Sequence, residues 1–381
     1  MADVLIERFD NRVAVGLGNT LWSWQRCDAC KTDGLYQSTS CSSRVSRANR
    51  YFNFYTGLLL DYHEASPPND RPFKTHGDIW NAISLLAKHP ELTRADFSER
   101  ILVPASKSIG ESLIMQATAL VVKIVCMTDC SNLYYSTGRL EEGSSGAFWE
   151  NQIPFNKYLQ DLFTVQNQPI WSSQHGQTEV LYERKRQLRA TKLIKHLDLN
   201  LCPTHNIHDH LRLDTRRNEL QIFHYASFLK ENLRSQKGSP QVNLLPRQLL
   251  LEVLDSTQRI LFPLGDAKSR KLLKSFIANK DYSFDPEIEK FELSAVCNPE
   301  ENISYRYLAN RLEDLFQELQ SPKPRKWLEK QLQRRSSARY MMLATLAGVA
   351  FAILLGVLAL ILSSVQTWIA YQAWKHPVVT A

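Results

Sequence analysis

Apolar residues recur at intervals of three and four along most of the chain, and this spacing predicts a mainly helical protein. The predicted helices cover residues 79–88, 94–102, 109–127, 154–163, 182–196, 249–262, 266–278 and 305–319. Apolar and polar residues alternate over 219–224, where we expect a short strand that leads into a helix ending near Leu233. The pattern therefore indicates a helical head with at most minor β-structure.

One stretch near the carboxyl end of the chain is apolar without interruption. Residues 341–362 read MMLATLAGVAFAILLGVLALIL and contain no charge. A helix of this length rises about 33 Å, which is enough to cross a hydrocarbon core of about 30 Å. Tyr340 precedes the stretch, and Trp368, Tyr371 and Trp374 follow it, as aromatic residues do at membrane interfaces. The sequence therefore predicts one transmembrane helix over 341–362, with a tail over 363–381.

The remaining boundaries follow changes in composition. Residues 1–65 are rich in aromatic side chains, and a polar break at 66–72 separates them from a helical head over 73–234. The most linker-like point after that is 235–239, followed by an amphipathic helical segment over 240–320 and a basic juxtamembrane segment over 321–340. The apolar helix at 109–127 contains Glu111 and Lys123, so we expect it in the core of the head rather than in a membrane.

The net charge of +7 comes from 46 Lys and Arg against 39 Asp and Glu. Most of the excess lies directly before the apolar stretch, at Lys323, Arg325, Lys326, Lys330, Arg334, Arg335 and Arg339. Residues 1–322 carry no net charge, so the pI near 8.9 does not indicate a nucleic-acid-binding protein. We expect these cations to contact the lipid bilayer and do not expect nucleic acid as a partner.

The orientation of the span follows from the same cations. Seven Lys and Arg precede the apolar stretch and Lys375 follows it, which predicts a cytosolic head. The amino-terminal sequence MADVLIERFD lacks the apolar core of a signal peptide, and 19 residues follow Leu362, so we expect a tail-anchored arrangement. A lumenal head, in which the sequon at Asn302 would be glycosylated, is the alternative. The generous apolar length favours a secretory-pathway membrane over the mitochondrial surface.

The apolar stretch also carries small residues at four-residue spacing, at Ala344, Gly348, Ala352 and Gly356. This spacing places them along one face of a helix. Burial of apolar side chains against another helix gains little over contact with lipid. Transmembrane helices therefore associate where small residues let their backbones approach closely. We therefore predict a homodimer formed through this helix, although glycine and alanine are also simply common in membrane spans.

Seven scattered cysteines do not form a disulfide framework, but four of them suggest a zinc site. Cys27 and Cys30 have the spacing of a zinc knuckle, and Cys126 and Cys130 would share one face of a continuous helix. A four-thiolate zinc site is one interpretation. Buried free cysteines that pack as small apolar groups are the other.

Cys202, His205, His208 and His210 form a second cluster of metal-ligand residue types within nine residues. An irregular loop could wrap them around a metal ion, whereas a surface loop with polar histidines is the alternative. The chain contains no Walker A, G-x-S-x-G, H-E-x-x-H or protein-kinase motif, and the glycines at 16 and 18 lack the third glycine of a dinucleotide fingerprint. The sequence therefore assigns no catalytic residue and no cofactor beyond the zinc interpretation.

Six cations lie along the predicted helix at 182–196, namely Arg184, Lys185, Arg186, Arg189, Lys192 and Lys195. Such a pattern is typical of a solvated helix face. Contact with anionic lipid or with an acidic partner is the alternative interpretation.

The carboxy-terminal third contains LFPLGDAKSRKLLKSFI and SYRYLANRLEDLFQELQ, which the apolar stretch follows. Over these segments the chain resembles a widespread, uncharacterised family of fungal proteins. The resemblance implies a fungal source and a single carboxy-terminal span, and family members sometimes lie beside secondary-metabolite genes. It implies no catalytic residues.

The expected function is that of a membrane-anchored protein whose cytosolic head binds protein partners at a membrane surface. A membrane-bound enzyme of unrecognised type, using a metal at a Cys/His cluster, is the alternative.

Overall fold

The computed structural model describes residues 9–24, 39–67, 70–102, 110–130, 148–166, 171, 178–238, 244–279, 283–291, 303–321 and 339–375. The chain divides into two compact units, Met1–Ser321 and Pro322–Ala381, which we call the head and the anchor segment. The predicted segments 1–65, 73–234 and 240–320 all contribute to the one head unit. The predicted fold class is confirmed, because the described residues are mainly helical, with one small sheet and one long apolar helix near the carboxyl end.

The amino-terminal part of the head is all-helical. Its helices are α1 (Asn11–Trp22), α3 (Thr39–Arg47), α4 (Asn49–Ala65), α5 (His76–Lys88), α6 (Arg94–Leu102) and α7 (Glu111–Cys126). Helix α1 begins after Asp10, whose carboxylate accepts the backbone N–H groups of Arg12 and Val13 in the first turn of the helix. Gly16 and Gly18 let the rings of Trp80 and Trp24 approach α1, since an added Cβ on either glycine would lie 2.3 Å from a ring carbon.

The core of the head is built from α7 and from aromatic side chains. The predicted core helix at 109–127 is confirmed as α7, which buries an unbroken run from Ala117 to Val122. Trp22 of α1 packs against Tyr51 and Phe52 of α4, and Tyr51 stacks on Phe228. Aromatic residues that are far apart in the head sequence therefore meet in one core.

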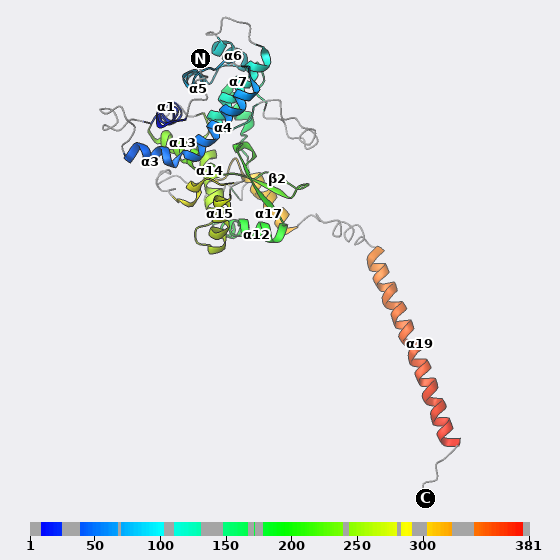
Figure 1. The fold of residues 1–381 in the computed structure, drawn as a ribbon. Coiled ribbons are helices and arrows are strands. Elements are labelled where there is room, and N and C mark those ends of the chain that lie inside the picture. Colours follow the sequence, from blue (N-terminus) through cyan, green and yellow to red (C-terminus); the bar gives the residue numbers. More distant parts are fainter. Residues whose placement is uncertain are drawn as a thin grey trace. The chain divides into compact units, whose positions relative to one another are not determined.

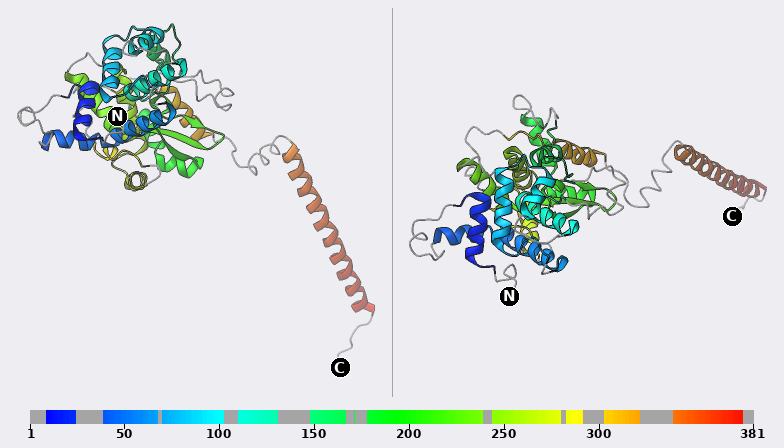
Figure 2. Two further views of the ribbon diagram at one scale, coloured as in Figure 1. Left: turned by 45° about the horizontal axis from the view of Figure 1, so that its top comes forward. Right: turned by 90° about the horizontal axis from the view of Figure 1, so that it is seen from above.

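A three-stranded sheet lies in the middle of the head sequence, after the helices α9 (Phe155–Leu162), α11 (Thr178–Gln187) and α12 (Ala190–Leu197). Its strands are β1 (Asn200–Thr204), β2 (Leu213–Asp214) and β3 (Glu219–Phe223), drawn as green arrows in Figures 1 and 2. The order is β1-β3-β2, with β3 parallel to β1 and antiparallel to β2. The predicted strand at 219–224 is thus confirmed as the centre of a sheet whose other strands the pattern did not indicate.

The prediction of one continuous helix over 182–196 is wrong, because two helices, α11 and α12, cover this segment. The chain leaves the helical conformation at Arg189, which has φ −60° and ψ 140° and precedes the first residue of α12. Leu188 is fully buried between the two helices. The turn therefore lets α11 and α12 follow different paths over the head.

The carboxy-terminal part of the head contains α13 (Ala226–Gly238), α14 (Arg247–Asp255), the π-helix η4 (Ser256–Leu261), α15 (Ala267–Ala278), the 3₁₀ turn η5 (Pro286–Glu289) and α17 (Ala309–Gln320). The predicted helix at 249–262 is therefore part α and part π. Helix α15 begins where predicted, because the carboxylate of Asp266 accepts the backbone N–H of Ser269. Helix α17 starts at Ala309 rather than at residue 305, after a segment held by Glu252.

The anchor segment contains α19 (Arg339–Lys375), a single helix of 37 residues (Figure 1). It contains the whole predicted span at 341–362 and continues through the aromatic residues after it. Its apolar side chains from Leu346 onward are exposed to the surroundings.

Candidate functional site

Helix α19 presents an apolar surface along its length. The stretch Thr345–Gln372 covers 28 residues. Its most apolar window of 18 residues has a mean hydropathy of 2.7, and none of that window is buried. A helix of 28 residues is about 42 Å long, against about 30 Å of hydrocarbon in a bilayer. Soluble monomers rarely leave an apolar surface of this size uncovered. Among the described residues, this is the one helix with the length and composition of a membrane span.

The polar residues of α19 suit an apolar medium. The hydroxyl of Ser364 donates to the carbonyl of Leu360, and that of Thr367 donates to the carbonyl of Ser363, each at 2.8 Å. These bonds satisfy the hydroxyls within the helix itself, so they do not depend on water. Beyond them, the rings of Tyr371 and Trp374 lie 6.4 Å apart. The carboxyl end of α19 thus has the character of an interfacial aromatic belt.

The predicted small-residue face occurs on this helix. Ala344, Gly348, Ala352 and Gly356 all lie within α19. A Cβ added at Gly348 or Gly356 would meet no atom within 4 Å, so the face is open to another helix. The structure contains one copy of the chain, and dimerisation stays a prediction.

Most of the predicted membrane-surface cations lie outside the described residues. These are Lys323, Arg325, Lys326, Lys330, Arg334 and Arg335, and the sequon residue Asn302 is also outside. Arg339 is the first residue of α19.

The predicted zinc thiolates divide between two regions. Cys27 and Cys30 lie outside the described residues. Cys126 is the last residue of α7, and Met127 then adopts a left-handed conformation with φ 48°, so Cys130 lies beyond the helix. The expectation that these two thiols share one helix face is therefore wrong.

Both thiols are buried in the core, and both pKa values are raised. Burial is the main cause, and for Cys130 the neighbouring Asp129 adds to it and the pKa reaches about 12. The thiols are thus protonated at neutral pH. That is the form in which cysteine packs as a small apolar group.

The second predicted metal cluster is spread over several environments. Cys202 lies on β1, and the Nδ1 atom of His205 lies 2.5 Å from the hydroxyl of Tyr225. The ring of His208 packs against Phe163. Among the described residues, no group of three His, Cys, Asp or Glu side chains is placed to hold a metal ion.

His210 forms a pair with Ser256 that resembles a catalytic dyad, since its Nε2 lies 2.8 Å from the serine Oγ. The other contacts decide its chemistry. The backbone N–H of Phe223 donates to Nδ1 of His210, so Nε2 carries the proton and donates to Ser256. The hydroxyl of Ser256 in turn donates to the carbonyl of Val253. A histidine that donates to the serine is not its base, so this pair joins the sheet to the π-helix and does not activate a nucleophile.

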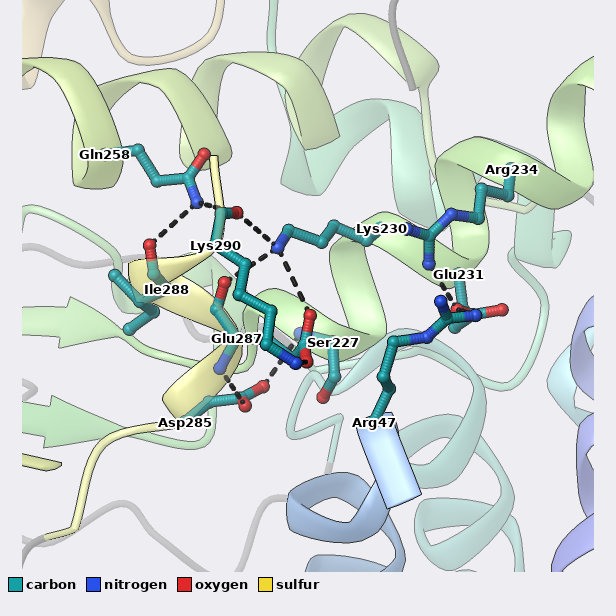
Figure 3. Close-up of polar contacts among 10 residues, drawn as sticks. All are labelled: Arg47, Ser227, Lys230, Glu231, Arg234, Gln258, Asp285, Glu287, Ile288 and Lys290. Atoms are coloured by element: carbon teal, nitrogen blue, oxygen red, sulfur yellow. Dashed lines mark hydrogen bonds and ion pairs between the residues drawn. The ribbon is translucent and has the colours of Figure 1, made fainter. Parts of the chain in front are cut away.

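A buried lysine holds the turn η5 (Figure 3). The ammonium of Lys230 on α13 is fully buried and donates to the carbonyls of Glu287 and Lys290, each at 2.7 Å. It also lies 3.4 Å from the Glu287 carboxylate. Asp285 accepts the backbone N–H groups of Ser227 and Glu287. Each buried charge of this group therefore has partners, which is the condition for keeping it inside a protein.

Glu231, the next residue of α13, joins the amino-terminal helices to this region. Its carboxylate lies 2.9 Å from the indole nitrogen of Trp24, 2.5 Å from Arg234 and 3.9 Å from Arg47, and Figure 3 shows both arginines directed toward it. The carboxylate is almost completely buried. It therefore links α13 to α3 and to the chain that directly follows α1.

A third polar group holds the start of α17. The carboxylate of Glu252 accepts the backbone N–H groups of Arg306, Tyr307 and Leu308 at 2.6 to 2.9 Å. These groups precede α17 directly, so a side chain of α14 supplies the acceptors that the chain would otherwise lack there. Arg311 adds bonds to the carbonyls of the sheet region. The last helix of the head is thereby fixed to its core.

The basic segment around 184–195 divides between these internal contacts and the surface. Arg184 pairs with Glu313 at 2.7 Å, and Lys185 lies 3.6 Å from the buried carboxylate of Asp255. Arg189 lies 3.9 Å from Asp266. These three cations therefore neutralise acids of the head. Sequence reasoning missed these groups because their members lie far apart in the chain.

No family model, no curated protein and no solved structure matches this chain. The chemistry of its own residues is therefore the basis for assigning a function.

Proposed function

We propose that the chain is a single-pass membrane protein whose head lies in the cytosol and binds protein partners at the membrane surface. The observation that carries this proposal is the exposed apolar stretch Thr345–Gln372 of α19. An aqueous solvent would penalise that surface at about 25 cal/mol for each square ångström. A bilayer removes the penalty, so the anchor segment is stable only when something apolar surrounds it.

The cytosolic orientation is supported by the charges that flank α19. Seven Lys and Arg lie in the sequence before the span, and Lys375 lies after it. Cations of short flanking segments stay on the cytoplasmic side. We also propose a membrane of the secretory pathway, supported by the long apolar stretch, because thicker membranes accommodate longer spans at lower cost.

A role in binding rather than in catalysis is supported by how the described polar clusters of the head are used. His210, Lys230 and Glu252 each bond to backbone groups that hold the fold together. Side chains with all of their bonding capacity engaged in this way are not available to substrate. We also propose that the protein comes from a fungus and is associated with secondary-metabolite genes. The resemblance of its carboxy-terminal third to a fungal family supports this.

We further propose that α19 forms a homodimer through Ala344, Gly348, Ala352 and Gly356. The open space around both glycines supports this, because a second helix backbone can approach there. Such a dimer would bring two heads together on one membrane.

Protease treatment of sealed microsomes tests the orientation. The full chain, carrying an epitope at each end, is synthesised with the microsomes and then digested. We expect loss of the amino-terminal epitope and survival of a short membrane-protected fragment with the carboxy-terminal epitope. Protection of the amino-terminal epitope would show that the head is lumenal, and loss of both epitopes would show that α19 does not cross the bilayer.

A further inference from the structure

The head carries a basic face made of two neighbouring helices, which we call the α12–α15 face. Helix α12 presents Lys192 and Lys195, and α15 presents Lys268, Arg270, Lys271 and Lys274, while neither helix contains an acidic residue. All four cations of α15 are exposed, and so is Lys195. The buried residues of α15 are Ser269 and Leu273, so its cations occupy the side turned away from the core.

The two helices lie side by side, and α12 also packs against α17 (Figure 1). The pair formed by Arg189 and Asp266 joins their first turns. Lys274 lies 4.0 Å from Glu289, a long and exposed pair. Within the described residues, the other five cations of the face have no acidic partner. The face thus retains a positive charge, in a head whose sequence is neutral as a whole.

We infer that the α12–α15 face binds the anionic lipid surface of the membrane in which α19 is anchored. This inference rests on the proposed function, since it needs the head and the anionic leaflet on the same side. Lysine and arginine near such a surface are attracted to it without a shaped pocket. The face has the charge that this attraction requires.

The length of chain between head and anchor favours the bilayer over other acidic ligands. The head ends at Ser321 and α19 begins at Arg339, so 17 residues join them. Fully extended, they span at most about 60 Å. The bilayer surface is therefore within reach of the head, and the tether raises its local concentration relative to a ligand in free solution.

The chemistry of the face also fits lipid better than nucleic acid. Single-stranded nucleic acid is bound by cations combined with aromatic side chains that stack on bases. Phe276, the one aromatic residue of the two helices, packs against Phe262 and Phe284 instead. The exposed side chains of α15 are cationic or small.

Lysine footprinting of the full chain in nanodiscs tests the inference. The protein is inserted into discs of phosphatidylcholine alone or into discs that also contain phosphatidylserine, then acetylated and mapped by mass spectrometry. We expect Lys195, Lys268 and Lys271 to react about threefold more slowly on the anionic discs. The difference should vanish at 1 M salt, where the Debye length is about 3 Å. The exposed Lys88 and Lys157, on α5 and α9, should react equally on both discs.

Two variants separate the effect of charge on the α12–α15 face from the effect of surface charge elsewhere on the head. Lys268→Glu with Lys271→Glu should abolish the protection of Lys195 on anionic discs. The matched variant Lys88→Glu with Lys157→Glu reverses the same number of exposed charges outside the face and should leave the protection unchanged.

The outcomes distinguish this inference from the proposed function. A chain that does not enter discs of either composition contradicts membrane anchoring itself. A chain that enters both discs, with equal reactivity of the three lysines, contradicts lipid binding by the face and leaves anchoring intact. A third arm adds polyuridylate RNA to the phosphatidylcholine discs. Protection by the RNA together with none by phosphatidylserine would overturn the lipid assignment and make the face a nucleic-acid surface.

Discussion

The head and α19 use apolar and charged residues in opposite ways. In the head, aromatic and aliphatic side chains meet in one core, and buried charges such as Lys230 and Glu252 are surrounded by acceptors or donors. In α19, large apolar side chains such as Leu346, Leu360 and Trp374 are exposed, and charge is absent between Thr345 and Gln372. The head therefore has the residue distribution of a protein in water, and α19 has that of a helix in lipid. This difference predicts which substitutions each region tolerates.

Charge placed in the middle of α19 should have the largest effect. Leu354→Arg with Leu358→Arg adds two cations where each costs about 3 kcal/mol to insert, about 6 kcal/mol together. We expect the variant to be lost from the membrane fraction after alkaline extraction. Leu354→Ile with Leu358→Ile changes shape without adding charge and should be retained. A doubly charged variant that resists extraction would show that α19 is not surrounded by lipid.

Removal of one buried charge in the head should have the next largest effect. Lys230→Met leaves the Glu287 carboxylate and two carbonyls with one donor fewer in a buried site. Breaking such a group lowers the free energy of unfolding by about 3 kcal/mol. Thermal unfolding of the full chain in detergent measures this. Lys274→Met removes an exposed cation and should change stability by less than about 0.5 kcal/mol, and equal effects of the two substitutions would refute the role of Lys230.

Acid should destabilise the head through its buried histidines. Burial, assisted by the charge of Arg311, lowers the pKa of His210 to about 3, and burial also lowers the pKa of His224. The unfolded value is about 6.5, so the stability contributed by neutral His210 is complete above that pH and is lost progressively as the pH falls toward 3. At pH 5 the loss is about 2 kcal/mol for His210.

The melting temperature, measured from pH 7.5 to pH 5, tests the role of His210. The variant His210→Gln should unfold at a lower temperature at pH 7.5 and should depend less on pH below 6.5. His89 is exposed, and His89→Gln should retain the full pH dependence. A pH profile of His210→Gln that parallels the parent would mean that His210 is not the group responsible.

The smallest expected effect concerns association of α19 with a second copy. Gly348→Ile with Gly356→Ile fills the face that the structure leaves open and should weaken dimerisation by about 1 to 2 kcal/mol, or roughly tenfold. Resonance energy transfer between labelled chains in vesicles reports the change. Ala350→Ile with Val357→Ile enlarges the opposite side of the helix and should leave transfer unaffected. If the glycine variant associates as well as the parent, the small residues reflect composition alone.

The anchor could be predicted from sequence because length and composition alone determine it. Helices such as α6 and α7 could also be predicted, because the spacing of their apolar residues is visible within a short stretch of sequence. The break at Arg189 could not be predicted, because it depends on the burial of Leu188 and on the contact with Asp266. The polar groups of the head were beyond sequence reasoning for a related reason. Lys230 and Glu287 are 57 residues apart, and only the folded chain brings them together.

We expect Thr345–Gln372 to cross a bilayer once, with the head on the cytosolic side. Glycosylation mapping in microsomes tests this arrangement. A sequon is appended through a short linker after Ala381, and the native sequon at Asn302 serves as the internal comparison. We expect the appended site to be glycosylated and Asn302 to remain unmodified. Glycosylation of Asn302, with the appended site left unmodified, would contradict it.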